Sequence, residues 1–379
     1  MAYNSIEKLV SRYEKGVLIT PWEYCFEMEA DGMTDDEKRE LETFKGKDAI
    51  ERYLIYRSTS CDCVQSVYIE GHNLAKDNIK KYGIIPDCDG SDGYCKLAID
   101  LYAKLWNAEK TKNKNGFEIK DISFAEKGKK LTFGGDTMNS FQTTLNWLLQ
   151  HFEETLYEFG QYKKERQRNN FSLNFCLQVY SIYKDYIYNL KKADDKLLGG
   201  KLNKYADTYH TLGNFVLVPS GFNKGRSSST CDFWDSSLVW LKSGYDDKFN
   251  SDDFNKYINY FFLWDYVDGV DEKGKFKIKP LFKSHDKIEQ GNWTNITSKE
   301  EAEQFMENAA RFILRRGIFM TAMLKLATNE EYTETYKTLQ KKIFSSDECY
   351  NGFNSVIEKV MEYDLPSDVR TILEHEELT

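Results

Sequence analysis

Proline is scarce in this chain of 379 residues, which contains only 5. Because proline interrupts helices and central strands, its scarcity removes a common obstacle to long helices. The sequence also lacks a run of about 18 apolar residues, the length that a membrane-spanning helix requires. The N-terminus is polar, and no apolar segment of a secretory signal follows it. We therefore expect a cytoplasmic protein with no membrane partner.

The 8 cysteines do not follow a zinc-binding pattern. Structural zinc sites place about two to four residues between paired cysteines. One residue separates Cys61 from Cys63, whereas six separate Cys88 from Cys95. The segment 87–93 is rich in Asp and Gly, but its spacing differs from that of an EF-hand loop. We expect these thiols to remain reduced and to bind no zinc.

Aromatic residues and an uneven charge are the features that the sequence does have. Aromatics make up 15% of the chain and hydrophobic residues 41%, enough to bury a sizeable core. The net charge is −9, yet residues 161–226 hold 12 Lys and Arg against 5 Asp and Glu. A basic middle in an acidic chain suits a polyanionic partner, and a solvated helix face is the alternative.

The spacing of apolar residues predicts an α+β fold that is predominantly helical, with a small sheet carrying a strand at 213–218. We expect an N-terminal helical region over 1–90 and a main α+β domain with C-terminal helices over 91–379. No linker rich in proline, glycine or serine separates them, so a single domain is the alternative.

Local signals predict several individual elements. Ser298 and Glu301 have the spacing of a capping box, so a long helix should begin there. Three more helices should follow it. Alternating runs at 117–119 and 131–133 predict a hairpin that ends at 134–136. The other expected elements are helices at 138–158, 233–242 and 252–265 and a strand at 275–279.

The segment 209–240 holds the densest set of unusual residues. Gly213 permits a close backbone approach, and Asn214 can fix a turn before the apolar strand. Glycines then punctuate a loop that carries two cations, an arrangement suited to phosphate. The residues predicted to bind phosphate or another ligand are Asn214, Gly221, Lys224 and Arg226. The alternative is a strand with a tight entry and an irregular exit, without a ligand.

The same segment resembles known families. The string from His210 to Pro219, followed by Phe222-Asn223 and Phe233-Trp234, resembles the C-terminal region of GmrSD-type restriction enzymes, which are His-Me finger (HNH-like) nucleases. Residues from about 95 to 325 also resemble an uncharacterised bacterial domain family. Its elements match Leu-Tyr-x-x-Leu-Trp at 101–106, the Gly-Asn strand, and Phe-Phe-Leu-x-Asp at 261–265.

The nuclease resemblance implies a set of catalytic roles. His210 would be the general base, and Asn223 with Asp232 or Asp235 would hold a divalent ion, Mg²⁺ being the natural choice. The chain departs from the family because no His-x-x-Pro precedes the Gly-Asn strand. That departure puts the chemistry in doubt more than the fold of the segment. No other cofactor is evident.

Two functions follow from these observations. The first is a nucleic-acid-associated protein of a defence system, with a divergent or inactive HNH-like segment and DNA or RNA as its partner. If it is an enzyme, it would be a metal-dependent nuclease or phosphodiesterase. The second is a non-enzymatic regulatory protein that binds another protein through its aromatic-rich helices and the loop 219–230.

Overall fold

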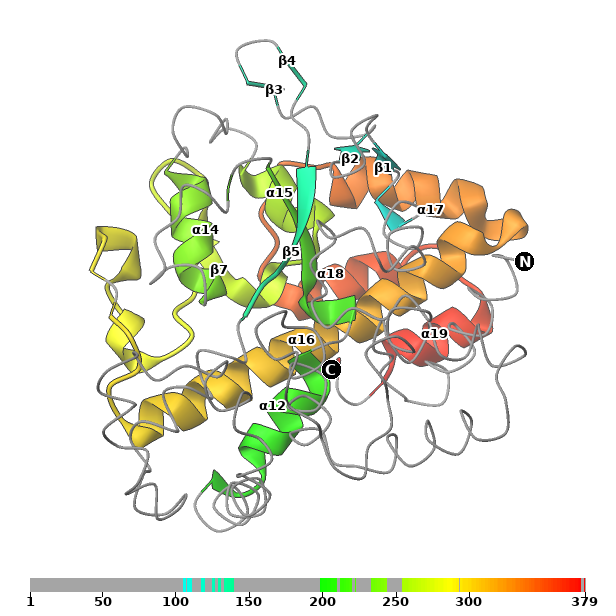
Figure 1. The fold of residues 1–379 in the computed structure, drawn as a ribbon. Coiled ribbons are helices and arrows are strands. Elements are labelled where there is room, and N and C mark those ends of the chain that lie inside the picture. Colours follow the sequence, from blue (N-terminus) through cyan, green and yellow to red (C-terminus); the bar gives the residue numbers. More distant parts are fainter. Residues whose placement is uncertain are drawn as a thin grey trace, which may run out of the picture.

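The computed structural model describes the C-terminal part of the chain almost continuously and the rest in pieces. The described residues are 105–106, 108–110, 117–119, 125–126, 129–130, 133–139, 198–209, 212–219, 222, 233–243, 254–292, 294–375 and 378. The fold is α+β and predominantly helical, as the sequence predicts (Figure 1). The expected region 1–90, its boundary and most of the expected helix at 138–158 lie outside the described residues.

A four-stranded antiparallel sheet carries the Gly-Asn segment. Its order is β1 (Ala108–Lys110), β2 (Phe117–Ile119), β5 (Phe133–Thr137) and β6 (Phe215–Pro219). The predicted strand is confirmed as β6, which pairs with β5 along its whole length; it begins at Phe215 rather than at 213, because Leu212–Asn214 form a 3-10 turn. A separate pair of short strands, β3 (Ala125–Glu126) and β4 (Lys129–Lys130), forms a small hairpin.

The expected end of the first hairpin is wrong. Phe117 does pair with Phe133, but β5 continues through Gly134 and Gly135 instead of stopping there. Gly134 pairs with Val218 and Gly135 with Leu217 on β6. Glycine is a weak strand former, yet the ladder to a distant, strongly apolar strand supplies the hydrogen bonds that hold it extended.

The helix α16 (Lys299–Thr328) is the central support of the described fold. Its 30 residues correspond to a length of about 45 Å. Figure 1 shows it crossing the molecule, and it contacts α12 (Lys201–Tyr209), η7 (Leu212–Asn214), α17 (Thr333–Leu339) and α19 (Ser367–Leu373). Its core face includes Phe305, Phe312, Ile313, Phe319 and Leu324, which are all buried.

The predicted N-terminus of α16 is confirmed, with one difference in its cap. The Ser298 hydroxyl oxygen accepts a hydrogen bond from the Glu301 amide at 3.2 Å, as a capping box requires. The Glu301 carboxylate accepts from the amide of Thr297 at 2.8 Å rather than from that of Ser298. The Glu301 carboxylate therefore holds Thr297, the residue before the cap, against the first turn of the helix.

The remaining elements surround this support. The predicted helix at 233–242 is confirmed as α14 (Trp234–Lys242). The predicted strand at 275–279 appears as β8 (Phe276–Ile278), paired with β7 (Val267–Val270). Three helices follow α16 as predicted: α17, α18 (Gly352–Met361) and α19. Three short 3-10 turns precede α16: η10 (Trp264–Tyr266), η11 (Lys283–His285) and η12 (Ile288–Gln290). The 3-10 turn η13 (Glu330–Tyr332) lies between α16 and α17, and the π turn η14 (Gln340–Phe344) follows α17.

The helix predicted over 252–265 is shorter in the structure. The helix α15 covers Phe254–Tyr260 and ends before Phe262, whose φ of 58° lies in the left-handed region. This conformation is costly for an aromatic residue. It directs the Phe262 ring against Phe319 and Phe344, at ring-centre distances of 5.0 Å and 4.8 Å. Tertiary packing therefore overrides the helical periodicity of the sequence.

Aromatic side chains fill the core rather than cover the surface. Trp264 lies against Phe319 and Phe353 at 5.4 Å and 5.5 Å, which joins η10 to α16 and α18. Among the side chains that the structure describes, Val270 is the only large hydrophobic one that is exposed. The described helices therefore use their aromatic residues for internal packing.

Candidate functional site

Gly213 is required by a close approach between η7 and α16. A Cβ atom at this position would lie 1.9 Å from the Ile313 carbonyl oxygen and 2.9 Å from the Gly317 nitrogen. The Gly213 carbonyl accepts a hydrogen bond of 2.7 Å from Nη1 of Arg316, whose Nε donates to the Phe261 carbonyl at 2.7 Å. The buried Arg316 thus ties the Gly-Asn segment and the end of α15 to the same turn of α16.

Asn214 joins the ends of β5 and β6. Its Oδ1 accepts from the Asn139 amide and its Nδ2 donates to the Asn139 carbonyl, both at 3.1 Å. The Asn214 carbonyl also accepts from the Met138 amide at 2.9 Å. A side-chain amide presents the same donor and acceptor as a peptide, so Asn214 continues the strand ladder for one more step. Asn214 is fully buried.

Asn139 extends this network to α14 and η10. Its Nδ2 donates to the Tyr266 hydroxyl at 2.8 Å, and its Oδ1 accepts from the Trp234 amide at 3.2 Å. Burial raises the pKa of Tyr266 strongly, so its hydroxyl remains protonated. Four elements (β5, η7, α14 and η10) therefore meet at two asparagine side chains.

Asp235 forms a second buried cluster beside the first. Its Oδ1 accepts from the Ser236 amide at 2.7 Å, and its Oδ2 accepts from the Leu281 amide at 2.8 Å. Nδ1 of His285 lies 2.7 Å from the same Oδ2, and its Nε2 lies 2.6 Å from the Thr294 carbonyl oxygen. The Asp235 and His285 side chains are both 0% exposed.

Both ring nitrogens of His285 are engaged by oxygen atoms of the protein. Nδ1 faces a carboxylate that already accepts from two amides, and Nε2 faces a backbone carbonyl oxygen. In a catalytic Asp-His pair, Nε2 takes the proton of a nucleophile. Here a backbone carbonyl occupies that position, so the pair fastens η11 and the segment 294–297 to α14.

Only two of the residues predicted for ligand or metal binding lie among the described residues. They are Asn214 and Asp235, and both are buried with their side-chain oxygens engaged inside the protein. The other six, His210, Gly221, Asn223, Lys224, Arg226 and Asp232, lie outside the described residues. Within the described part of the chain, no group of three or more His, Cys, Asp or Glu side chains could hold a metal ion.

The segment 223–232 lies between two buried aromatic residues. Phe222 is fully buried on one side, and Phe233 on the other packs against Phe282 and Phe305, each at a ring-centre distance of 5.2 Å. The strand before it is fixed as well, because the Tyr257 hydroxyl donates to the Leu217 carbonyl at 2.8 Å. Both attachments of this cationic segment therefore belong to the core.

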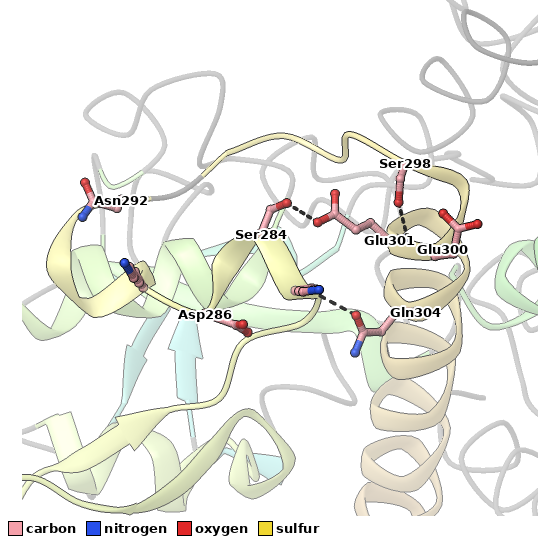
Figure 2. Close-up of a pocket in the computed structure, with 9 residues that line it drawn as sticks. Ser284, Asp286, Asn292, Ser298, Glu300, Glu301 and Gln304 are labelled. Atoms are coloured by element: carbon pink, nitrogen blue, oxygen red, sulfur yellow. Dashed lines mark hydrogen bonds between the residues drawn. The ribbon is translucent and has the colours of Figure 1, made fainter.

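A polar pocket of about 770 Å³ lies at the start of α16 (Figure 2). Ser284 and Glu301 point toward each other there and are hydrogen-bonded, and Gln304 accepts from the Lys283 amide at 3.1 Å. Burial acts to raise the pKa of Glu301, but hydrogen bonds from Ser284 and Thr297 outweigh it and lower that pKa. The lining residues are Lys283, Ser284, Asp286, Lys287, Asn292, Ser298, Glu300, Glu301 and Gln304.

The sequence does not predict this pocket. Ser298 and Glu301 have the spacing of a capping box, but the opposite wall comes from η11 and η12. Nothing local in the sequence brings 283–292 against the start of α16. His285 fastens η11 to Asp235 on α14 and to the Thr294 carbonyl, close to that approach.

Comparisons with known proteins add no relative to this picture. No family model, no curated protein and no solved structure matches the chain. Within the described residues, no helix is long and apolar enough to cross a membrane.

Proposed function

We propose that this protein is a cytoplasmic nucleic-acid-associated protein that binds DNA or RNA through the segment 220–232. The observation that carries the proposal is the fixed attachment of this segment, since buried Phe222 and Phe233 bracket its two cations, Lys224 and Arg226. A loop whose ends are fixed loses less conformational entropy on binding than a free one. Cationic side chains beside glycine amides are suited to phosphate oxygens.

The proposal assigns binding, rather than hydrolysis, to this segment. Asp235, one of the expected metal ligands, has both carboxylate oxygens hydrogen-bonded in the core. A divalent ion would have to displace His285 and two amides to reach them. The protein is therefore proposed as a binding member of a defence system, the setting that the resemblance to restriction enzymes implies.

Binding to labelled single-stranded DNA, double-stranded DNA and RNA across a salt series tests the proposal. Affinity should fall steeply with salt, and the double variant Lys224→Ala/Arg226→Ala should bind more weakly with a slope reduced by about 2 in log–log terms. The matched control is Lys341→Ala/Lys342→Ala, which removes the same charge from exposed positions in η14. Equal weakening of both variants, or binding insensitive to salt, would contradict the proposal.

Hydrolysis is tested in the same samples with Mg²⁺. Intact strands after incubation with the wild-type protein agree with a binding role. Cleavage that disappears in His210→Ala but persists in the Lys341→Ala/Lys342→Ala control would instead establish a nuclease.

A further inference from the structure

Lys279 and Arg311 both lie against the ring of Phe312. Nζ of Lys279 lies 5.5 Å from the ring centre, and Cζ of Arg311 lies 5.2 Å from the same centre. Lys279 follows β8, whereas Arg311 belongs to α16, so two distant segments bring like charges to one ring. Neither side chain forms an ion pair in the described part of the protein. Attraction to the ring holds both charged groups in place.

A third cation, Arg315, lies one turn further along the same face of α16. Its Nη1 is 3.0 Å from Oδ1 of Asp265, and its Nη2 donates to Asn354 and to the Leu378 carbonyl. All three cations act on the carboxyl group of Asp265: burial raises its pKa to about 6, while Arg315, Lys279 and Arg311 each lower it. The cluster thus carries three positive charges against one buried carboxylate.

This excess of positive charge is unusual in a chain whose net charge is −9. Bringing like charges together is unfavourable unless an anion balances them. Arg315 is already engaged by Asp265, whereas Arg311 is exposed and makes only a hydrogen bond of 3.0 Å to Asn308 within its own helix. Lys279 is half-buried beside it. The side chains of Lys279 and Arg311 are therefore available to a ligand, and the positive charge of Arg315 adds to theirs.

We propose that Lys279 and Arg311, supported by Arg315, form a binding site for a phosphate group. A guanidinium offers paired N–H donors and an ammonium offers a point charge, the two groups that phosphate oxygens prefer. The phosphate could come from free inorganic phosphate or from the backbone of a nucleic-acid strand, because the recognised chemistry is the same. The site is separate from the segment 220–232 and does not depend on the function proposed for it.

The probe for this site is inorganic phosphate, followed by the ³¹P line width at constant ionic strength set with sodium chloride. The wild-type protein should show saturable broadening, and Lys279→Ala/Arg311→Ala should bind about tenfold more weakly or worse. The control Lys341→Ala/Lys342→Ala should match the wild type. Asp265→Asn removes the negative charge of the carboxylate that pairs with Arg315 and should strengthen binding, which gives a second readout of opposite sign.

Equal phosphate binding by the wild type and Lys279→Ala/Arg311→Ala, or no effect of Asp265→Asn, would overturn the proposal. A second arm with a labelled oligonucleotide identifies the source of the phosphate. Weaker oligonucleotide binding by Lys279→Ala/Arg311→Ala supports a nucleic-acid backbone, and unchanged binding beside lost phosphate binding supports the free anion. Failure of the segment 220–232 as a binding site would appear in Lys224→Ala/Arg226→Ala alone, so the two proposals fail separately.

Discussion

Single side chains in this protein form hydrogen bonds with the backbone of segments that are distant in the sequence. Asn214 supplies one donor and one acceptor to Asn139 and so continues the β5–β6 ladder after the strands end. Arg316 joins two carbonyls from segments far apart in sequence. The absence of a side chain at Gly213 permits these contacts, because it lets the backbone of η7 lie directly against α16. Packing and internal hydrogen bonds therefore explain why Gly213 and Asn214 stand in this segment.

Replacing Gly213 by alanine should destabilise the protein by about 3 kcal/mol or more, since overpacking at a rigid backbone contact exceeds the usual range. The added Cβ would meet backbone atoms of α16 that cannot move independently. Urea unfolding provides the measurement. Gly274→Ala is the comparator, because its φ is 70° and its surroundings are open, so only backbone strain of about 1–2 kcal/mol applies. A smaller loss for Gly213→Ala than for Gly274→Ala would argue against the packing explanation.

At the scale of elements, one hydrogen-bonded pair of buried side chains, Asp235 and His285, holds a wall of the pocket. His285 connects η11 to Asp235 on α14 and to the Thr294 carbonyl in the segment that leads into α16. Leu281 is held by the same carboxylate. The polar pocket at the start of α16 thus depends on a buried pair whose members do not line it.

A double-mutant cycle on this pair has a definite expected outcome. Asp235→Asn and His285→Gln should each cost about 3–5 kcal/mol, because each leaves a buried polar partner uncompensated. The double variant should cost much less than the two losses combined, which is the sign of direct coupling. Unfolding free energies from urea titrations give all four corners of the cycle. Additive losses would show that the two side chains act independently.

Element prediction succeeded where the signal was local. Ser298 and Glu301 lie three residues apart, and their capping geometry marked the start of α16 correctly. The extension of β5 through Gly134 and Gly135 could not be foreseen, because its partner strand lies more than 80 positions away. Likewise, Asp235 and His285 are 50 positions apart, and Asn139 and Asn214 are 75 apart. Such contacts form only in the tertiary structure, and the residues next to each partner in the sequence carry no signal of them.

At the scale of the whole molecule, buried carboxyl groups make opposing contributions to stability as the pH changes. The raised pKa of Asp265 means that the folded state binds a proton more tightly than the unfolded state. Its contribution is present below pH 4 and is lost as the pH rises through about 6. Glu301 and Glu303 have lowered pKa values, so their contributions are present above the unfolded pKa and are lost in acid.

Asp265→Asn separates these contributions. The stability difference between the wild type and this variant should change by up to about 3 kcal/mol between pH 4 and pH 7.5, with the variant favoured at the higher pH. The Asp265 side chain is only 11% exposed, so solvent screening is weak. Urea unfolding at several pH values measures the difference. Parallel stability curves for the two proteins would show that Asp265 has an ordinary pKa.

The place of α16 in the chain has a consequence for synthesis on the ribosome. Gly213 and Arg316, which meet in the core, are 103 positions apart. At roughly 5–20 residues per second, about 5–20 s pass between the emergence of the two. The interval is longer still for Leu105, because the carbonyl of Leu105 accepts a hydrogen bond from the hydroxyl of Tyr336. During this time α12 and η7 lack the helix against which they pack, so the newly made chain should be a substrate for chaperones that shield exposed apolar segments.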